Sequence, residues 1–167
     1  RLDLFVCGAK PEADAVAAGF GHPPGVVRYL GLCRYDGLPT GGEREKSGMV
    51  LFMPTWRAPL KDVSTQEFES STYYKGIMEL LNSAALGQLL EDTGYTLLFA
   101  PHVEVLPYLG SFRSSLPRVR IQEPEGREVQ RLLIEADVLI TDYSSVFFDF
   151  AYQQKPLAYY QYDDAEY

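Results

Sequence analysis

The chain has 167 residues, of which 46% are hydrophobic, enough for one well-buried core and too few for two large ones. Its net charge of -8 and isoelectric point near 4.7 exclude a general surface for nucleic acid or for an anionic membrane, because both need a basic face. An anionic ligand would therefore require a local pocket.

The two cysteines, Cys7 and Cys33, lie in or beside apolar stretches, without paired spacing or a nearby histidine cluster. This pattern predicts buried, reduced thiols in a reducing compartment rather than a disulfide or a metal site. We expect no metal and no cofactor.

No apolar run approaches the roughly 18 to 20 residues that span a bilayer, and no signal-peptide pattern opens the chain. The sequence starts at Arg1 without a methionine and stops just after a strand pattern. We therefore expect a fragment of a longer protein.

Seven apolar runs of strand length follow one another along the chain, at 2–8, 26–31, 49–55, 95–101, 118–122, 137–142 and 156–162. Helical patterns lie between several of them, chiefly at 72–92, 103–113, 126–136 and 144–153. This alternation predicts an α/β fold with a mainly parallel sheet and helices on both faces. We expect the strand in 137–142 to be central, because its apolar residues are continuous.

The helical pattern at 72–92 predicts a buried stripe, formed by Ile77, Leu80, Leu81, Ala84, Ala85 and Leu89. Gly94 follows as a stop signal. The segment 36–48 is rich in glycine and charge, which is typical of a surface loop or a short linker.

Polar residues follow the run 137–140 in the sequence "TDYSS", which ends with Ser144 and Ser145. Ligands of parallel sheets bind outside the carboxyl ends of the strands, and a helix start offers unpaired N–H groups and partial positive charge. The two hydroxyls add hydrogen-bond donors for phosphate oxygens. The open alternative is that Ser144 or Asp142 only caps the helix.

Other polar residues follow predicted strands in the same way. His102 can donate a hydrogen bond to a phosphate or act as a general acid, and Arg57 can clamp a phosphate with two hydrogen bonds. The alternatives are an ordinary surface histidine and a solvated loop arginine. Arg34 and Asp36 follow another predicted strand, and they would face the same edge of the sheet.

Four motifs together resemble the carboxyl-terminal domain of the CDP-glycerol glycerophosphotransferases, the teichoic-acid primases and polymerases. They are "GLCRYDGL", "MPTWR", the strand ending in "PH", and "ADVLITDYSSVFFDFAYQQKPLAYYQYD", and they span 31–163. That family is similar to two-domain transferases of the GT-B type, in which a carboxyl-terminal Rossmann-like half holds the nucleotide donor. The resemblance implies that residues 1–167 form one nucleotide-donor-binding domain.

The resemblance also implies roles for individual residues. His102 matches a functionally important histidine and is expected to be catalytic as CMP leaves. The residues implied to bind CDP and its diphosphate are Arg57, Thr141, Asp142, Ser144, Ser145, Arg34 and Asp36. Cys33 replaces the proline of a family "GLPRYD" motif, which loosens that turn. The implied reaction is attack of a glycerol hydroxyl on the β-phosphorus of CDP-glycerol.

The implied partners are CDP-glycerol or another CDP-alditol as donor and, in the full-length enzyme, a glycerophosphate-type lipid-linked acceptor. No nucleic acid is implied, and membrane contact would be made only by parts outside this chain. The parent protein is expected to be cytoplasmic and peripheral on the inner face of the membrane, and the isolated domain to be inactive. Two alternatives stay open, a GT-B transferase that uses CDP-ribitol or a nucleotide-sugar, and a non-catalytic nucleotide-binding module.

Overall fold

Residues 2–41, 45–122 and 129–164 are described by the computed structural model of the chain. Contacts divide the chain into two units, Arg1–Pro39 and Thr40–Tyr167, called below the N-terminal unit and the C-terminal unit. The boundary falls within the segment 36–48 that was predicted to be a loop or linker, of which 42–44 lie outside the described residues.

The N-terminal unit is a short β-α-β arrangement. Strands β1 (Phe5–Cys7) and β2 (Val27–Tyr29) pair in parallel, helix α1 (Lys10–Gly19) connects them, and the 3-10 helix η1 (Cys33–Tyr35) follows. Both cysteines are free thiols. Cys7 is buried as predicted, whereas Cys33 is exposed, because it begins η1, in which no residue is buried.

The C-terminal unit contains a five-stranded sheet in which every neighbouring pair is parallel. Its strands, in the spatial order β5-β4-β3-β6-β7, are β3 (Met49–Phe52), β4 (Thr96–Phe99), β5 (Val119–Ile121), β6 (Val138–Thr141) and β7 (Leu157–Tyr159). The predicted α/β fold with a parallel sheet is confirmed. Strand β6 is an interior strand, while β3 holds the middle position.

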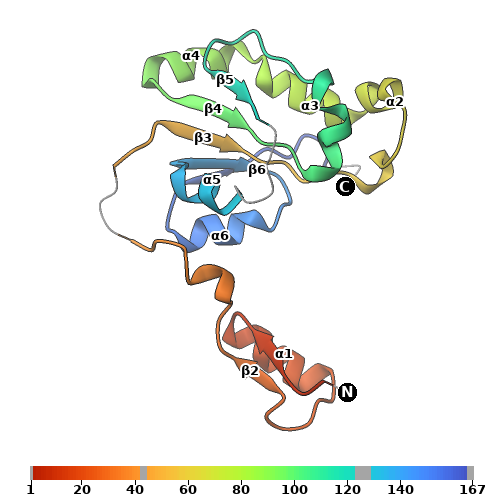
Figure 1. Cartoon of the computed structure of the whole chain (residues 1–167), viewed down its shortest axis with the longest axis vertical. Coiled ribbons are helices and arrows are strands. Elements are labelled where there is room, and N and C mark those ends of the chain that lie inside the picture. The colour runs from red at the N-terminus through yellow and green to blue at the C-terminus, as the bar shows by residue number, and fades with distance from the viewer. Residues whose placement is uncertain (1, 42–44, 123–128, 165–167) are drawn as a thin grey trace. The chain divides into compact units, whose positions relative to one another are not determined.

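Helices cover both faces of this sheet (Figure 1). On one face lie α2 (Thr65–Ser70), α3 (Thr72–Leu81), α4 (Ala84–Thr93) and the 3-10 helix η3 (Val103–Ser111). On the other face lie α5 (Val129–Glu135) and α6 (Val146–Tyr152). A short 3-10 helix, η2 (Ala58–Leu60), follows β3.

Two separate cores form because successive strand residues point to opposite faces. Phe52, Leu97 and Phe99 pack with Phe68 and Ile77 of the α2–α3 layer. The core on the opposite face contains Leu51, Leu132, Leu139 and Phe150. The strands are therefore buried on both sides, as their continuous apolar runs predicted.

The pattern at 72–92 forms two helices rather than one. Helix α3 ends at Leu81 with Asn82 as its C-cap, and Ser83 caps α4 by accepting a hydrogen bond from the N–H of Leu86. This restart shifts the apolar face of the second helix, so that Leu86 and Leu90 pack inward. The expectation of burial was therefore wrong for Ala84, Ala85 and Leu89, which are exposed. Gly94 ends α4 as predicted, with a φ of 76°.

The order of the strands reverses between β3 and β6. From β3 the chain adds β4 and then β5 on one side, and it returns to add β6 and β7 on the other. The loops that leave the two strands at such a reversal diverge and form a crevice at the carboxyl edge, where α/β proteins bind ligands. The segments 53–57 and 142–145 occupy this position.

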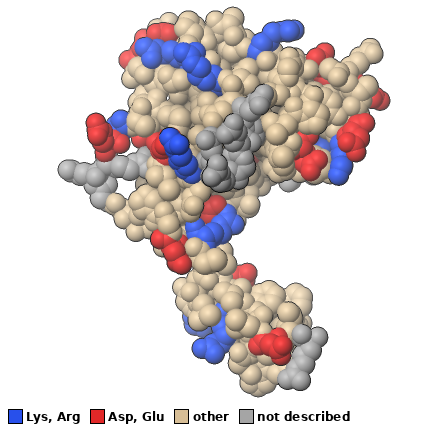
Figure 2. All heavy atoms as spheres, in the orientation of Figure 1, with Lys and Arg blue, Asp and Glu red and all other residues tan. Residues whose placement is uncertain are grey.

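Figure 2 shows one face of the molecule, on which acidic and basic side chains occur in small groups among uncharged ones. Among the described residues, no helix is long and apolar enough to cross a membrane.

Candidate functional site

Asp142 connects the loop after β6 with the loop after β3. Its Oδ1 accepts a hydrogen bond from the N–H of Thr55 at 2.8 Å and another from the N–H of Tyr143 at 2.6 Å. Thr141 adds a second link, because its Oγ1 donates to the carbonyl oxygen of Met53 at 2.7 Å. Thr141 and Asp142 are both buried, so they fix the shape of the crevice from within.

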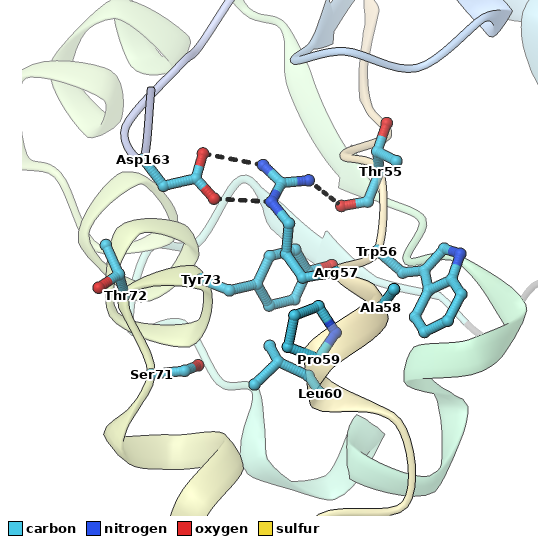
Figure 3. Close-up of a pocket in the computed structure, with 10 residues that line it drawn as sticks. All are labelled: Thr55, Trp56, Arg57, Ala58, Pro59, Leu60, Ser71, Thr72, Tyr73 and Asp163. Carbon is cyan, nitrogen blue, oxygen red and sulfur yellow. Dashed lines mark hydrogen bonds and ion pairs between the residues drawn. The ribbon is translucent and has the colours of Figure 1, made fainter. Parts of the chain in front are cut away.

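Arg57 joins these loops to the segment after β7 (Figure 3). Its Nε donates to Asp163 at 2.6 Å, and its Nη2 donates to Asp142 and Asp163 at 2.9 Å. Its Nη1 donates to the carbonyl oxygen of Thr55 at 2.6 Å. Burial opposes the charge, but the hydrogen bond to Asp163 and the charge of Asp142, among others, raise the pKa of Arg57 above its ordinary value. The guanidinium is therefore charged and held by its fork of donors.

Three tyrosine rings surround this guanidinium. The Cζ of Arg57 lies 5.4 Å from the ring centroid of Tyr73, 5.3 Å from that of Tyr143 and 5.9 Å from that of Tyr162. These distances suit cation–π attraction. Gly76 leaves room for the ring of Tyr162, because a Cβ at position 76 would lie 2.3 Å from Cδ2 of that ring. Burial raises the pKa of Tyr73 and of Tyr162, so both phenols are neutral.

A pocket of about 490 Å³ opens beside Arg57. Its walls are residues 55–60 after β3, residues 71–73 at the start of α3, and Asp163. Figure 3 shows the guanidinium between Asp163 and the carbonyl oxygen of Thr55, with the indole of Trp56 on one side of the pocket. The pocket therefore lies at the carboxyl edge of the sheet.

His102 lies next to this pocket, because its ring contacts Trp56 in the pocket wall. Its imidazole stacks on Trp56 with the ring centroids 6.0 Å apart and the planes 17° from parallel. The side chain is exposed, and its Nδ1 accepts a hydrogen bond from the N–H of Glu104 at 3.2 Å. This acceptor role assigns the hydrogen of the neutral ring to Nε2. The structure thus brings His102 into contact with Trp56, the residue that precedes Arg57 in the loop after β3.

Ser144 and Ser145 follow Asp142 at the same sheet edge. Ser145 is the residue before α6, but its side chain makes no capping hydrogen bond. Ser144 Oγ accepts from the N–H of Val146 only at 3.5 Å, the outer limit for such a bond. The capping alternative therefore has little support from the geometry of these two hydroxyls.

Arg34 and Asp36 lie in the N-terminal unit and not in the C-terminal unit with the other predicted residues. Arg34 is exposed, and its Cζ lies 5.7 Å from the ring centroid of Tyr35. The N–H of Asp36 donates to the carbonyl oxygen of Cys33. Their role toward a common site stays a prediction.

Sequence reasoning missed Asp163 and the tyrosines around Arg57. A usable signal was present, since Asp163 and Asp164 follow the apolar run of β7, and polar residues after parallel strands were the basis for the other site residues. Among the described residues, no group of three or more His, Cys, Asp or Glu could hold a metal ion.

Residues 37–167 match a protein family described as "CDP-Glycerol:Poly(glycerophosphate) glycerophosphotransferase". The chain belongs to this family. The resemblance seen in the sequence motifs is thereby confirmed, and the chain is part of a transferase family of teichoic-acid biosynthesis.

Curated relatives carry the corresponding names. The chain is 31% identical over 173 residues to the minor teichoic acid biosynthesis protein GgaB of Bacillus subtilis strain 168, covering 98% of the chain and 19% of that protein. It is 51% identical over 124 residues to a teichoic acid poly(ribitol-phosphate) polymerase of Bacillus spizizenii strain W23, covering 71% of the chain and 17% of that protein. The chain thus spans less than a fifth of either relative.

Solved structures of the wall teichoic acid polymerase TagF share the fold. One superposes with a TM-score of 0.63 at 22% identity, over 99% of this chain and 41% of TagF. A TagF variant soaked with CDPG for 30 minutes superposes with a TM-score of 0.62 at 20% identity, over 99% of this chain and 39% of that TagF chain. The five-stranded parallel α/β unit is therefore also part of a known polymerase.

Proposed function

We propose that the C-terminal unit binds the CDP-activated alditol donor of a teichoic-acid glycerophosphotransferase at the carboxyl edge of its sheet. The observation that carries the proposal is the joining of the loops after β3 and β6 by Asp142 and Thr55, at the position where the strand order reverses. Diphosphate-containing nucleotides bind at this position in doubly wound folds.

Ser144 and Ser145 supply hydroxyl donors to the donor diphosphate in this proposal. Helix α6 has only seven residues, so the hydroxyls rather than the helix dipole carry the interaction. Neither hydroxyl is committed to a short capping bond, which leaves both suited to phosphate oxygens. Thr141 and Asp142 act by holding the edge in shape, and Arg57 acts through its links between the loops.

His102 is the proposed catalytic residue. A hydrogen on Nε2 can be donated to a phosphate oxygen of the donor, stabilising the negative charge that develops on CMP as it leaves. The acceptor hydroxyl oxygen forms a bond to the β-phosphorus while the bond from that phosphorus to the CMP oxygen breaks. The hydroxyl proton passes to a base outside this chain. Alignment and charge neutralisation are sufficient for such a transfer.

The alditol has two candidates. Glycerol is the first, because the family description names CDP-glycerol. Ribitol is the second, because the poly(ribitol-phosphate) polymerase shares 51% of its matched residues with this chain, whereas a poly(glycerol phosphate) polymerase from the same organism shares 30%. In the parent protein, the proposed acceptor is a lipid-linked glycerophosphate polymer on the inner face of the membrane.

Calorimetric titration of the 167-residue chain with CDP-glycerol, CDP-ribitol and a UDP-sugar tests this function. We expect both CDP-alditols to bind at least about tenfold more tightly than the UDP-sugar, a difference of about 1.4 kcal/mol. Replacing His102 by Ala should leave binding measurable but weakened. If none of the three compounds binds, the donor-binding function is wrong.

A further inference from the structure

Two contacts hold the imidazole ring of His102. His102 is the residue before the 3-10 helix η3, and its Nδ1 accepts a hydrogen bond from the N–H of Glu104 at 3.2 Å. Trp56 stacks on the ring with the centroids 6.0 Å apart, within the range of about 4.5 to 7 Å that is typical of aromatic pairs. The hydrogen bond selects the ring edge that faces the backbone, and the stack fixes the ring plane. Without them, this exposed side chain would sample several rotamers.

The other ring nitrogen, Nε2, is the one that can act on a ligand. Nδ1 is occupied as an acceptor, so the neutral ring carries its hydrogen on Nε2. Within the described part of the chain, Nε2 has no hydrogen-bond partner. The two contacts therefore hold the ring by one edge and one face, and they leave the donor atom of the proposed mechanism open.

Trp56 is itself fixed by its two neighbours in the chain. The N–H of Thr55 donates to Asp142 at 2.8 Å, and the carbonyl oxygen of Thr55 accepts from Arg57 at 2.6 Å. Arg57 also donates to Asp142 and Asp163 at 2.9 Å. Figure 3 shows the guanidinium directed toward Asp163 and the indole of Trp56 directed away from it. The backbone on either side of Trp56 is therefore tied to buried carboxylates.

Arg57, Asp142 and Asp163 form a cluster, called below the Arg57 cluster, that is poorly suited to binding phosphate. Four hydrogen bonds from the guanidinium already go to the two carboxylates and to the Thr55 carbonyl oxygen. Since a guanidinium has five N–H donors, few are left for an anion. The bonds go instead to the loop that carries Trp56 and to the loops beside it.

We propose that Trp56 is a positioning residue for His102, and that the Arg57 cluster holds Trp56 in place for this task. Trp56 acts by keeping Nε2 of His102 in one orientation, and it does not itself bind the donor. The effect on the reaction rests on the proposed catalytic function of His102, whereas the orientation of the ring does not.

Three-bond NMR couplings of the His102 side chain, measured in the 167-residue chain, test the orientation. We expect a single χ1 rotamer in the wild type, averaging over rotamers in Trp56→Leu, and a single rotamer again in Trp56→Phe, which keeps an aromatic face. The matched control is Phe20→Leu, because Phe20 stacks on the other histidine, His22, with the centroids 6.4 Å apart. That variant should leave the His102 couplings unchanged. Averaged couplings in the wild type, or a single rotamer in Trp56→Leu, overturn the proposal.

The same couplings test the part played by the Arg57 cluster. Arg57→Lys keeps the charge but loses the fork of donors, so it cannot hold Thr55 and both carboxylates at once. Asp163→Asn keeps the size of the side chain, removes its charge, and serves as a second variant if the first does not fold. We expect the His102 couplings to become partly averaged in each folded variant. A single rotamer of His102 in these variants overturns the role of the cluster.

A double-mutant cycle on CDP-glycerol affinity shows whether Trp56 acts through His102. Releasing the ring among the staggered χ1 rotamers lowers the population of the competent one about threefold, so Trp56→Leu should weaken binding by about threefold. In a His102→Ala background the same change should have no effect. Additive losses mean that Trp56 contacts the donor itself, and they overturn the proposal. If even the wild type does not bind CDP-glycerol, the donor-binding function fails, while the couplings still decide whether Trp56 positions His102.

Discussion

Nε of Arg57 donates a hydrogen bond to Oδ2 of Asp163 over 2.6 Å, although 106 positions separate the two residues in the chain. The side chains are 10% and 4% exposed, so this ion pair is largely withdrawn from water. Together with the bond to Asp142, it fixes the loops after β3 and β6 and the segment after β7 to one another. Removing one member of such a buried group leaves charge without compensation.

Replacing Arg57 by Met should therefore destabilise the C-terminal unit by about 3 to 5 kcal/mol, measured by urea unfolding. The matched control is Arg118→Met, because Arg118 pairs with Glu91 at the surface, where the two side chains are 36% and 51% exposed. In that variant the free energy of unfolding should fall by less than about 1 kcal/mol. Equal losses in the two variants would contradict a buried role for Arg57.

Gly76→Ala should destabilise the protein, although this change inside a helix normally stabilises by about 0.5 to 1 kcal/mol. The added Cβ would lie 2.3 to 2.9 Å from three ring atoms of Tyr162, and such overpacking costs about 1 to 3 kcal/mol. At Gly110, an added Cβ meets nothing within 4 Å, so Gly110→Ala is the control for urea unfolding. A Gly76→Ala variant as stable as the control would show that Tyr162 does not pack here.

Lys155 terminates helix α5 by donating from Nζ to the carbonyl oxygens of Leu133, Ile134 and Ala136 at 2.6, 2.7 and 2.9 Å. Replacing Lys155 by Met removes these charge-assisted bonds and should lower the free energy of unfolding by about 1.5 to 3 kcal/mol. Lys75→Met, at an exposed position of α3, should change it by less than about 0.5 kcal/mol. No difference between the two would refute the capping role.

The capping box of α2 predicts a dependence on pH. Hydrogen bonds from the Ser64 side chain and backbone lower the pKa of Glu67, so the folded protein binds this proton less readily than the unfolded chain. The resulting stabilisation is present above the unfolded pKa of about 4.3 and is lost as the pH falls through the folded pKa. Urea midpoints should show wild type and Glu67→Gln converging at low pH. A constant difference from neutral to acid would exclude this linkage.

Local sequence signals predicted most of the fold. Each apolar run became a strand, and the continuous runs of β3, β4 and β6 lie in a sheet with a core on both faces. Gly94 ended a helix, as its freedom for positive φ suggests. Helix α2 was missed because it has only six residues, although Ser64 and Glu67 form the capping-box signature. Ser83 is an equally readable start signal for α4, and it explains why a single long helix was the wrong prediction.

The site could be predicted only to the level of the sheet edge. The rule about strand ends placed Arg57, His102 and Asp142 there, since it needs only the position of each strand. The same rule could have placed Asp163 at this edge, but it could not predict that Arg57 pairs with Asp163, because that pairing joins residues 106 positions apart in the chain. Whether a carboxylate or a ligand holds a guanidinium depends on that tertiary arrangement.

The affinity of the chain for CDP-glycerol, before and after replacing both Ser144 and Ser145 by Ala, tests donor binding at this edge most directly. Hydrogen bonds to a charged group contribute about 1.5 to 3 kcal/mol each, and about 1.4 kcal/mol corresponds to tenfold in affinity. We therefore expect binding to weaken by at least about tenfold, with a nearly unchanged urea midpoint, since neither hydroxyl makes a short capping bond. Unchanged affinity with a lowered midpoint would show that the two serines only cap α6 and would contradict donor binding by their hydroxyls.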